Sequence, residues 1–231
     1  MSILFDGNND YASYAGSLGS AGAHPLTIAL WLSRINLSGA KCVAQIGVGG
    51  GVDTESVSIR TNATGNVIAR AHDASVISDA VTTVTALDTD WHHYAGVYSA
   101  TNSRTAYLDG TASTTNTGNR TFSNSFDELI IGNSFLSNTD FNGYIAHVAI
   151  WTSALSGTDV ASLAAGANPQ AIDASNLFAY YPMTSSGSPG EDIVGSYDLT
   201  LYNQAAYDSN NPTVDSYGGG AISRLMLMGI G

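Results

Sequence analysis

The sequence predicts an all-β protein built as an antiparallel two-sheet sandwich, and three observations support this fold class. Apolar and polar residues alternate along short runs, which is the period of a half-buried strand. Clusters of Gly, Asn, Ser and Asp separate these runs at short intervals, as in sandwiches and barrels. Asp109-Gly110 and the polar stretch 62–66 each provide a hairpin turn between two such runs.

Strands are expected wherever an alternating run occurs. In chain order, the expected strands cover residues 26–32, 43–48, 56–60, 67–71, 91–98, 105–108, 129–132 and 144–151. The stretch 62–66 should join two of them, and Asp109-Gly110 should join 105–108 to the Thr-rich segment that follows.

One short helix is expected after Ser156. Ser156 is a favourable N-cap residue, and the Asp159 carboxylate three residues later can bond back to the N-cap backbone. Leu155 can pack against Val160 as a hydrophobic staple, and Gly166 ends the helix. We expect this helix to lie as a lid on the edge of the sandwich.

The remainder of the chain predicts a return to strand and then an extension. Residues 177–183 and 197–202 have strand composition, whereas residues 205–220 are polar and aperiodic. The sequence therefore predicts one sandwich domain over residues 1–204 and a C-terminal extension over residues 205–231. The extension ends in the apolar run Leu225-Met226-Leu227-Met228, which is unusual for a chain end. This run could add a strand to its own sandwich or pack onto a neighbouring subunit, and the sequence leaves both open.

The charge balance excludes several classes of partner. Charged residues make up 11 % of the chain, and the formal net charge is −12 at pH 7. Such a surface repels phosphate backbones and anionic lipids, so we expect neither nucleic-acid binding nor membrane insertion. No run reaches the ~18 apolar residues of a membrane helix, and no signal peptide is visible, so we expect synthesis in the cytoplasm. Cys42 is the only cysteine; it cannot form an intrachain disulfide, and we expect it to be buried.

Several ordered motifs resemble laminin-G-like jelly-roll domains of the concanavalin A-like lectin/glucanase superfamily. They cover roughly residues 3 to 165. The matching segments are Phe5-Asp6-Gly7 with Asp10-Tyr11, residues 26–31, Trp91-His92-His93-Tyr94, Tyr107-Leu108-Asp109-Gly110, Ile130-Ile131-Gly132, residues 141–145, and Trp151 through Ser156. The resemblance implies two antiparallel sheets in jelly-roll topology. It implies little about activity, because this fold carries lectins, hydrolases, adhesion modules and structural proteins.

Enzymatic chemistry finds little support in the residues. Glycoside hydrolysis needs two carboxyl groups about 5 to 9 Å apart across a cleft. The sequence has only three glutamates, Glu55, Glu128 and Glu191, and they are widely separated. Asp127 and Glu128 should face opposite sides of a strand, and Asp53 and Glu55 should lie in a Gly-rich loop. We therefore predict no catalytic residues and no enzyme activity.

The spacing of potential ligands in the sequence predicts no metal or cofactor site. Calcium is possible by analogy with relatives, and the loop-borne candidates are Asp6, Asp10, Asp88, Asp90 and Asp140. His92 and His93 are adjacent on a strand, so their side chains should point apart and cannot chelate one ion together.

Two binding roles remain for the predicted sandwich. Exposed aromatic residues could stack on glycans, and Tyr11, Tyr14 and Tyr217 lie near loops. The combination of an extracellular-type module, no signal peptide and an apolar tail resembles structural proteins of tailed bacteriophages. We therefore expect a virion-surface component, in the capsid or the tail, that docks onto virion proteins, forms homo-oligomers and binds glycans through loops. The alternative is a free lectin or adhesin domain.

Overall fold

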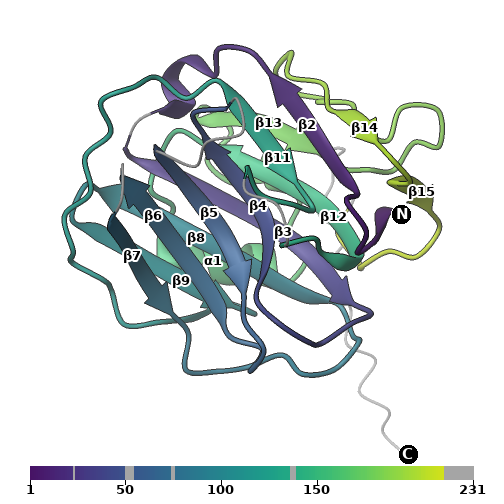
Figure 1. The fold of residues 1–231 in the computed structure, drawn as a ribbon, viewed down its shortest axis with the longest axis horizontal. Helices are drawn as coiled ribbons and strands as arrows, with labels where there is room; N and C mark the ends of the chain where they lie inside the picture. Colours follow the sequence, from purple (N-terminus) through teal and green to yellow (C-terminus); the bar gives the residue numbers. More distant parts are fainter. Residues whose placement is uncertain (23, 50–54, 74–75, 136–138, 216–231) are drawn as a thin grey trace, which may run out of the picture.

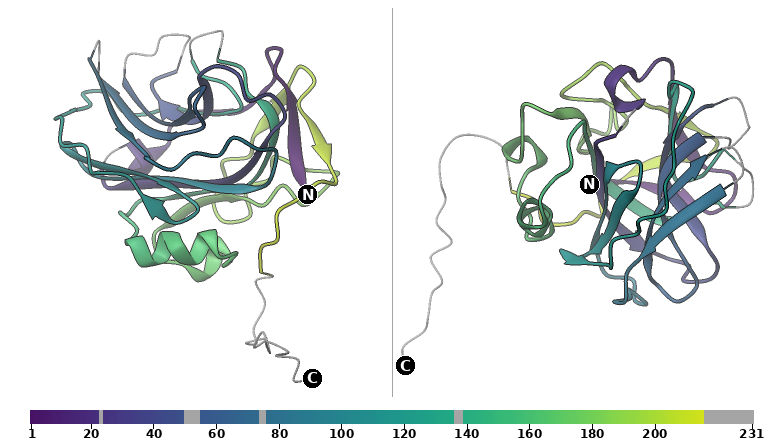
Figure 2. Two further views of the ribbon diagram at one scale, coloured as in Figure 1. Left: turned by 90° about the horizontal axis from the view of Figure 1, so that it is seen from below. Right: turned by 90° about the vertical axis from the view of Figure 1, so that its left-hand side faces the viewer.

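Two antiparallel sheets pack face to face, with one α-helix outside them (Figures 1 and 2). The computed structural model describes residues 1–22, 24–49, 55–73, 76–135 and 139–215, and all structural statements below concern these residues. The prediction of an all-β, two-sheet antiparallel sandwich with one short helix is confirmed.

The first sheet has eight strands. In order across the sheet they are β10 (Thr111–Ala112), β9 (Ser103–Leu108), β8 (His92–Ala100), β3 (Leu26–Arg34), β12 (Asn142–Trp151), β1 (Ser2–Asp6) and β15 (Ala206–Asp208), with β13 (Leu177–Tyr181) also paired to β12. The strand β12 therefore has β1 beside its first half and β13 beside its second half.

The second sheet has seven strands. In order they are β14 (Thr200–Tyr202), β2 (Tyr11–Ala15), β11 (Glu128–Ile131), β4 (Lys41–Gly47), β5 (Glu55–Thr61), β6 (Val67–Asp73) and β7 (Val76–Val81). Two short 3-10 helices, η1 (Gly19–Gly22) and η2 (Pro169–Ala171), lie in connections. Every strand predicted from alternation corresponds to an observed strand, with ends that differ by a few residues.

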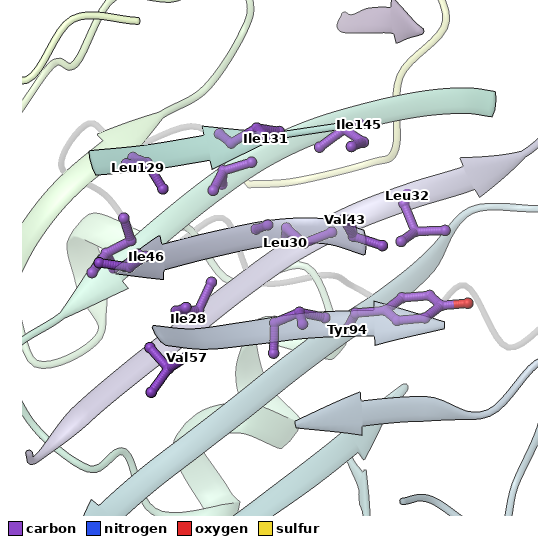
Figure 3. Close-up of a cluster of buried hydrophobic side chains, with 14 of the residues drawn as sticks. Ile28, Leu30, Leu32, Val43, Ile46, Val57, Tyr94, Leu129, Ile131 and Ile145 are labelled. Atoms are coloured by element: carbon purple, nitrogen blue, oxygen red, sulfur yellow. The ribbon is translucent and has the colours of Figure 1, made fainter. Parts of the chain in front are cut away.

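The core lies between the facing sheets (Figure 3). Alternate residues of each strand point inward, and those of β3, β4 and β11 meet in one apolar cluster. The labelled members of this cluster are Ile28, Leu30, Leu32, Val43, Ile46, Val57, Tyr94, Leu129, Ile131 and Ile145. Each such aliphatic side chain is buried, and full burial contributes about 1.5–3 kcal/mol per residue.

The helix α1 (Gly157–Ala164) begins as the sequence predicts. The Asp159 amide donates to Ser156 Oγ (3.2 Å), and the Ser156 amide donates to Asp159 Oδ2 (3.0 Å). Its position is not the predicted edge: α1 packs on the outer face of the eight-stranded sheet. Val160 and Leu163 form an apolar stripe on the helix. This stripe packs in one apolar cluster with Ala95 and Val97 on the outer face of β8.

Four observed strands were not among those predicted: β1, β2, β7 and β15. The strand β7 forms beside β6, where its register pairs Arg70 with Asp79. The strand β15 lies in the stretch 205–220 that the sequence predicted to be aperiodic. It pairs with β1, where Tyr207 lies opposite Ile3, so the sheet continues past residue 204. The strands β7 and β15 lie at sheet edges, and β1 and β2 are five-residue strands next to an edge strand. Short strands in such positions are specified by their neighbours rather than by their own pattern.

The predicted hairpin turn at Asp109-Gly110 is confirmed. Both residues have positive φ, 48° and 79°, which is the backbone of a tight two-residue turn between β9 and β10. No helix among the described residues is long and apolar enough to span a membrane.

Candidate binding surface

Two tyrosines stack on the outer face of the seven-stranded sheet. Tyr11 of β2 and Tyr202 of β14 lie directly opposite each other in the strand register. Their ring centroids are 4.5 Å apart and the ring planes differ by 13°. Their chain neighbours Ala12 and Leu201 face the core instead. We call Tyr11 and Tyr202 the tyrosine platform.

The platform is open to solvent because β14 is the edge strand of its sheet. Tyr202 is 40 % exposed, while Tyr11 is half-buried. In a parallel stack each ring covers one face of the other, and the high exposure of Tyr202 shows that much of this side chain stays uncovered. An aromatic ring held in this way is a ready surface for a flat, partly apolar ligand.

A buried carboxylate fixes the chain segments around the platform. Asp10 is fully buried, and it accepts hydrogen bonds from the amides of Asp6 and Gln204, each at 2.8 Å. These two bonds tie the segment before β2 to the turn after β14. The Asn203 side-chain amide adds a bond to the Asn9 carbonyl. Both asparagines have positive φ, 62° for Asn9 and 59° for Asn203, a conformation that Asn tolerates better than most residues.

Polar groups lie beside the platform on the same face. Ser13 and Thr200 form the next cross-strand pair, and Glu128 of β11 points outward because Leu129 points into the core. Burial, then the neighbouring Tyr202 and Glu128, raise the pKa of Tyr11, so its hydroxyl remains protonated near neutral pH. The surface therefore offers ring faces and the hydroxyls of Tyr202 and Thr200, with the Glu128 carboxylate on the same face.

The three tyrosines proposed from the sequence have different fates. Tyr11 belongs to the platform. Tyr14 is half-buried and packs edge-on against Tyr197, with ring centroids 5.3 Å apart, so it belongs to the core margin. Tyr217 lies outside the described residues. Tyr202 was missed, although alternation in the predicted strand 197–202 already places it on the same face as Thr200.

The five aspartates proposed as calcium ligands do not gather into one cluster of carboxylates among the described residues. Asp6 accepts from the Asn8 amide (2.7 Å), and Asp140 accepts from the Asn133 side chain (2.6 Å). Asp88 accepts from the Asp90 amide (2.9 Å), and Asp10 is used as described above. Among the described residues no group of three or more His, Cys, Asp or Glu side chains is placed to hold a metal ion. The calcium hypothesis gains no ligand set from this arrangement.

His92 and His93 point to different surroundings, as predicted. His92 lies between two carboxylates, with Nδ1 2.6 Å from Asp109 and Nε2 2.8 Å from Asp88. The hydrogen bond to Asp109 raises the pKa of His92 to about 9, against the effect of burial and with help from Asp88. His93 is buried against Trp31, at a ring separation of 5.4 Å, and burial lowers its pKa to about 4. His92 is therefore a cation held between Asp88 and Asp109, which we call the His92 clamp. His93 is a neutral ring packed in the interior.

The glutamates do not form a catalytic pair with one another. Glu55 is buried and accepts from the amides of Ser123 (2.9 Å) and Asn124 (2.8 Å), which gives it a loop-anchoring role. Glu191 lies in the connection between β13 and β14, and Asp53 lies outside the described residues. Cys42 is buried, as predicted.

Asp127 and Glu128 both lie near Gly49. Alternation predicts opposite faces for Asp127 and Glu128, but both reach Gly49. The Gly49 amide donates to Asp127 Oδ1 (2.8 Å), and a Cβ built on Gly49 would lie 2.1 Å from Glu128 Oε2. The reason is that Asp127 precedes β11, where strand alternation does not yet apply.

The sequence of residues 6–161 matches a laminin G family described as the concanavalin A-like lectin/glucanases superfamily. This match covers more than half of the chain. The chain belongs to this superfamily. No curated protein matches the sequence significantly.

Solved structures show the same fold at low sequence identity. Domain 4 of AbnA, an extracellular arabinanase from Geobacillus stearothermophilus solved with arabinotriose, has a TM-score of 0.58 and 16 % identity, over 71 % of this chain and 76 % of that chain. A heptameric SAP-like pentraxin from Limulus polyphemus has a TM-score of 0.58 and 13 % identity, over 90 % and 92 %. A putative carbohydrate binding protein from Bacteroides ovatus has a TM-score of 0.62 and 16 % identity, over 93 % and 60 %. Likeness at this level of identity shows a shared fold and nothing finer.

Proposed function

We propose that this protein is a non-enzymatic carbohydrate-binding module that holds a saccharide on the tyrosine platform. The observation that carries the proposal is the exposed stack of Tyr11 and Tyr202, 4.5 Å apart, with hydroxyl and carboxylate groups on the same sheet face. Sugar rings present apolar C–H faces and hydroxyl edges, and this surface complements both. Support also comes from the fold neighbours, one solved with arabinotriose and one described as a putative carbohydrate binding protein.

A binding role fits the acidic residues better than a catalytic one. Glu55 is committed to backbone amides, and Asp127 accepts from the Gly49 amide, so both carboxylates have structural tasks. A glycosidase needs one carboxyl group free to give a proton and another free to act as base or nucleophile. We expect no turnover of polysaccharides, measured as release of reducing sugar, and no difference between the native chain and a Glu128→Gln variant.

The virion role expected from the sequence remains a prediction. None of the solved structures named above is a virion protein, and these comparisons favour the alternative of a free carbohydrate-binding domain. Docking to a capsid or tail through residues 205–231, homo-oligomer formation and a virion-surface location all await test. Deleting residues 221–231 should abolish particle binding if the virion role is correct; unchanged assembly would exclude it.

The platform is tested by removing its exposed ring. Binding is first measured on an array of neutral and sialylated oligosaccharides that includes arabinotriose, and the best ligand is then titrated by calorimetry. Tyr202→Ala removes the stacking surface, and we expect affinity to fall about tenfold, equivalent to about 1.4 kcal/mol. Tyr202→Phe keeps the ring and should lose less.

A matched control separates binding from folding. Tyr207 is a half-buried tyrosine on β15, the edge strand of the other sheet, so Tyr207→Ala carries the same change away from the platform. This variant should bind with native affinity. If no saccharide on the array binds, or if Tyr202→Ala binds as well as the native chain, the platform does not have the proposed role.

A further inference from the structure

A groove of about 550 Å³ lies on the other sheet, away from the tyrosine platform. It is formed around the junction of β12 and β13, next to the beginning of β1 and the last described residues of the chain. Its apolar lining residues include Met1, Pro182, Ile193 and Val214. Met1 and Ile193 are 40 % and 43 % exposed, which is high for apolar side chains that share one concavity.

A β-bulge brings His147 into the wall of this groove. The register between β12 and β3 shifts between Ala146 and Ala149, and His147 has a φ of 50°. Bulges re-aim side chains in this way. The His147 Nδ1 lies 2.6 Å from the Tyr180 hydroxyl, and burial lowers the pKa of His147 to about 4. The His147 ring is thus neutral near pH 7 and is already paired with the Tyr180 hydroxyl. This part of the groove wall therefore does not favour a charged ligand.

The groove also carries amide side chains. Asn168, Gln170 and Asn211 line it. The Asn168 amide already donates to the Asp215 carbonyl and accepts from the Gln170 backbone amide, and Asn211 donates to the Pro212 carbonyl, so the Gln170 side chain and the Asn211 oxygen are the groups that can pair a ligand. An extended peptide presents alternating N–H and C=O groups, which such amides can pair, while apolar walls take its side chains. The lining therefore suits a mainly apolar peptide segment.

The chain itself leads out of this groove. Asp215, the last described residue, lines the groove and is held there: its amide donates to the Gly166 carbonyl (2.7 Å), and its carbonyl accepts from the Asn168 side chain (3.1 Å). Residues 216–231 continue from this anchored point. Their sequence contains three consecutive glycines, Gly218 to Gly220, followed by the apolar residues Ile222, Leu225, Met226, Leu227, Met228 and Ile230.

We propose that residues 222–230 occupy this groove in the same molecule. The six intervening residues can span about 20 Å when extended, and glycine permits the chain to reverse direction. A segment tethered this closely competes at an effective concentration in the mM range, above that of a neighbouring molecule in dilute solution. The occupant is thus the chain's own apolar tail, and this inference does not depend on saccharide binding.

The test uses the full-length chain. A nitroxide label is attached to a Leu227→Cys variant; Cys42 is 0 % exposed and remains unlabelled. Amide NMR signals near the groove, such as those of Gln170, Ile193 and Val214, should broaden strongly. Signals of β7 should not, because β7 lies at the far end of the sandwich from the amino terminus that borders the groove (Figure 1). Absence of broadening at the groove overturns the proposal.

Two further measurements make the assignment specific. A second sample mixes native chain that carries the NMR isotopes with Leu227→Cys chain that carries the nitroxide but no isotopes. In this mixture we expect no broadening at the groove. Broadening as strong as in the doubly labelled chain would mean that a neighbour's tail fills the groove, and it would overturn the intramolecular form. Ile193→Ser removes an apolar contact of the groove and should reduce broadening several-fold. Val81→Ser changes a similarly exposed residue (40 %) on β7 and should leave it unaltered. Equal broadening in both variants also overturns the proposal.

Discussion

Arg34 and Arg104 are the two most deeply buried arginines among the described residues, and their surroundings differ in one decisive way. Arg34, at the end of β3, is 2 % exposed, and Arg104, on β9, is 0 % exposed. Burial lowers the pKa of both guanidinium groups. The two sites thus carry the same charge at the same depth, and they differ in what accepts the hydrogen bonds.

Arg104 is surrounded by acceptors. Its Nη1 donates to Asn116 Oδ1 (3.1 Å), and its Nη2 donates to the carbonyls of Thr101 (2.9 Å) and Gly118 (2.6 Å). Asn116 in turn donates to the Asp79 carbonyl on the free edge of β7 (2.9 Å). One buried cation therefore organises the loop after β10 and covers an edge that would otherwise be open to pairing.

Arg34 has no such partners. None of its three guanidinium nitrogens has a hydrogen-bond acceptor among the described residues, and the buried hydroxyl of Tyr94 is also unpaired there. A buried charge without acceptors costs free energy that a paired one recovers in part. The comparison teaches that depth alone does not decide the contribution of a buried arginine; the acceptors around it decide its sign.

The largest expected effect is at Arg104. Arg104→Met keeps much of the volume but removes three charge-assisted hydrogen bonds and takes from the Gly118 carbonyl its side-chain donor, so the free energy of unfolding should fall by about 2–3 kcal/mol. Urea denaturation followed by circular dichroism measures this. A loss below about 0.5 kcal/mol would contradict the contrast between Arg104 and Arg34, because substitutions of ordinary surface residues change the free energy of unfolding by that much.

Arg34 should respond in the opposite direction. Arg34→Met removes a desolvated charge without orphaning any acceptor, so the free energy of unfolding should rise by about 1–2 kcal/mol. The same urea titration tests it, with Arg104→Met as the matched variant. Destabilisation by Arg34→Met would mean that the Arg34 guanidinium has hydrogen-bond acceptors. That result would contradict the contrast drawn between Arg34 and Arg104.

His92 is an intermediate case between an exposed and a buried cation: it is partly exposed and is paired with two carboxylates. Its pKa of about 9 lies above the ordinary value of 6.5, so its stabilisation is complete below pH 6.5 and is lost as the pH rises toward 9. Solvent screening reduces the contribution to about 1–2 kcal/mol. His92→Gln should therefore cost stability at pH 6 and almost none at pH 10, measured by urea titration at both values.

A control is needed on the acid side of that experiment. His93 and His147 have pKa values lowered to about 4, so they make the native chain lose stability as the pH falls from 6.5 toward 4. This loss is common to the native chain and His92→Gln, and the difference between the two isolates His92. A difference that does not change between pH 6 and pH 10 would contradict the clamp.

The sequence predicted the long central strands well, but it missed four shorter strands, two of them at sheet edges. Residues 26–32 and 144–151 are apolar enough to specify buried strands by themselves, and they became β3 and β12. The strands β7 and β15 need a partner strand to exist, and single-sequence alternation carries no information about partners. The helix was predicted to the correct cap because Ser156 and Asp159 interact locally, but its position depends on Ala95 and Val97, some 60 residues earlier.

The candidate site was predicted in part for a similar reason. Tyr11 could be named because it stands near a loop, but its stacking partner Tyr202 is almost 200 residues away, and only the pairing of β14 with β2 joins them. The groove and the bulge at His147 depend on backbone geometry that residue types do not encode. Local chemistry can be inferred from sequence, whereas convergence of distant segments cannot.

The position of β1 has a consequence for biosynthesis. This first strand pairs with β12 and β15, so its final neighbour is made about 200 residues later. Its first neighbour, β12, is made about 140 residues after β1. At typical translation speeds that takes roughly 7–28 s, during which the segment has no sheet to join. Ile3 and Phe5 are fully buried in the finished molecule and would be exposed throughout that time. The nascent chain should thus depend on shielding at the ribosome more than its compact final state suggests.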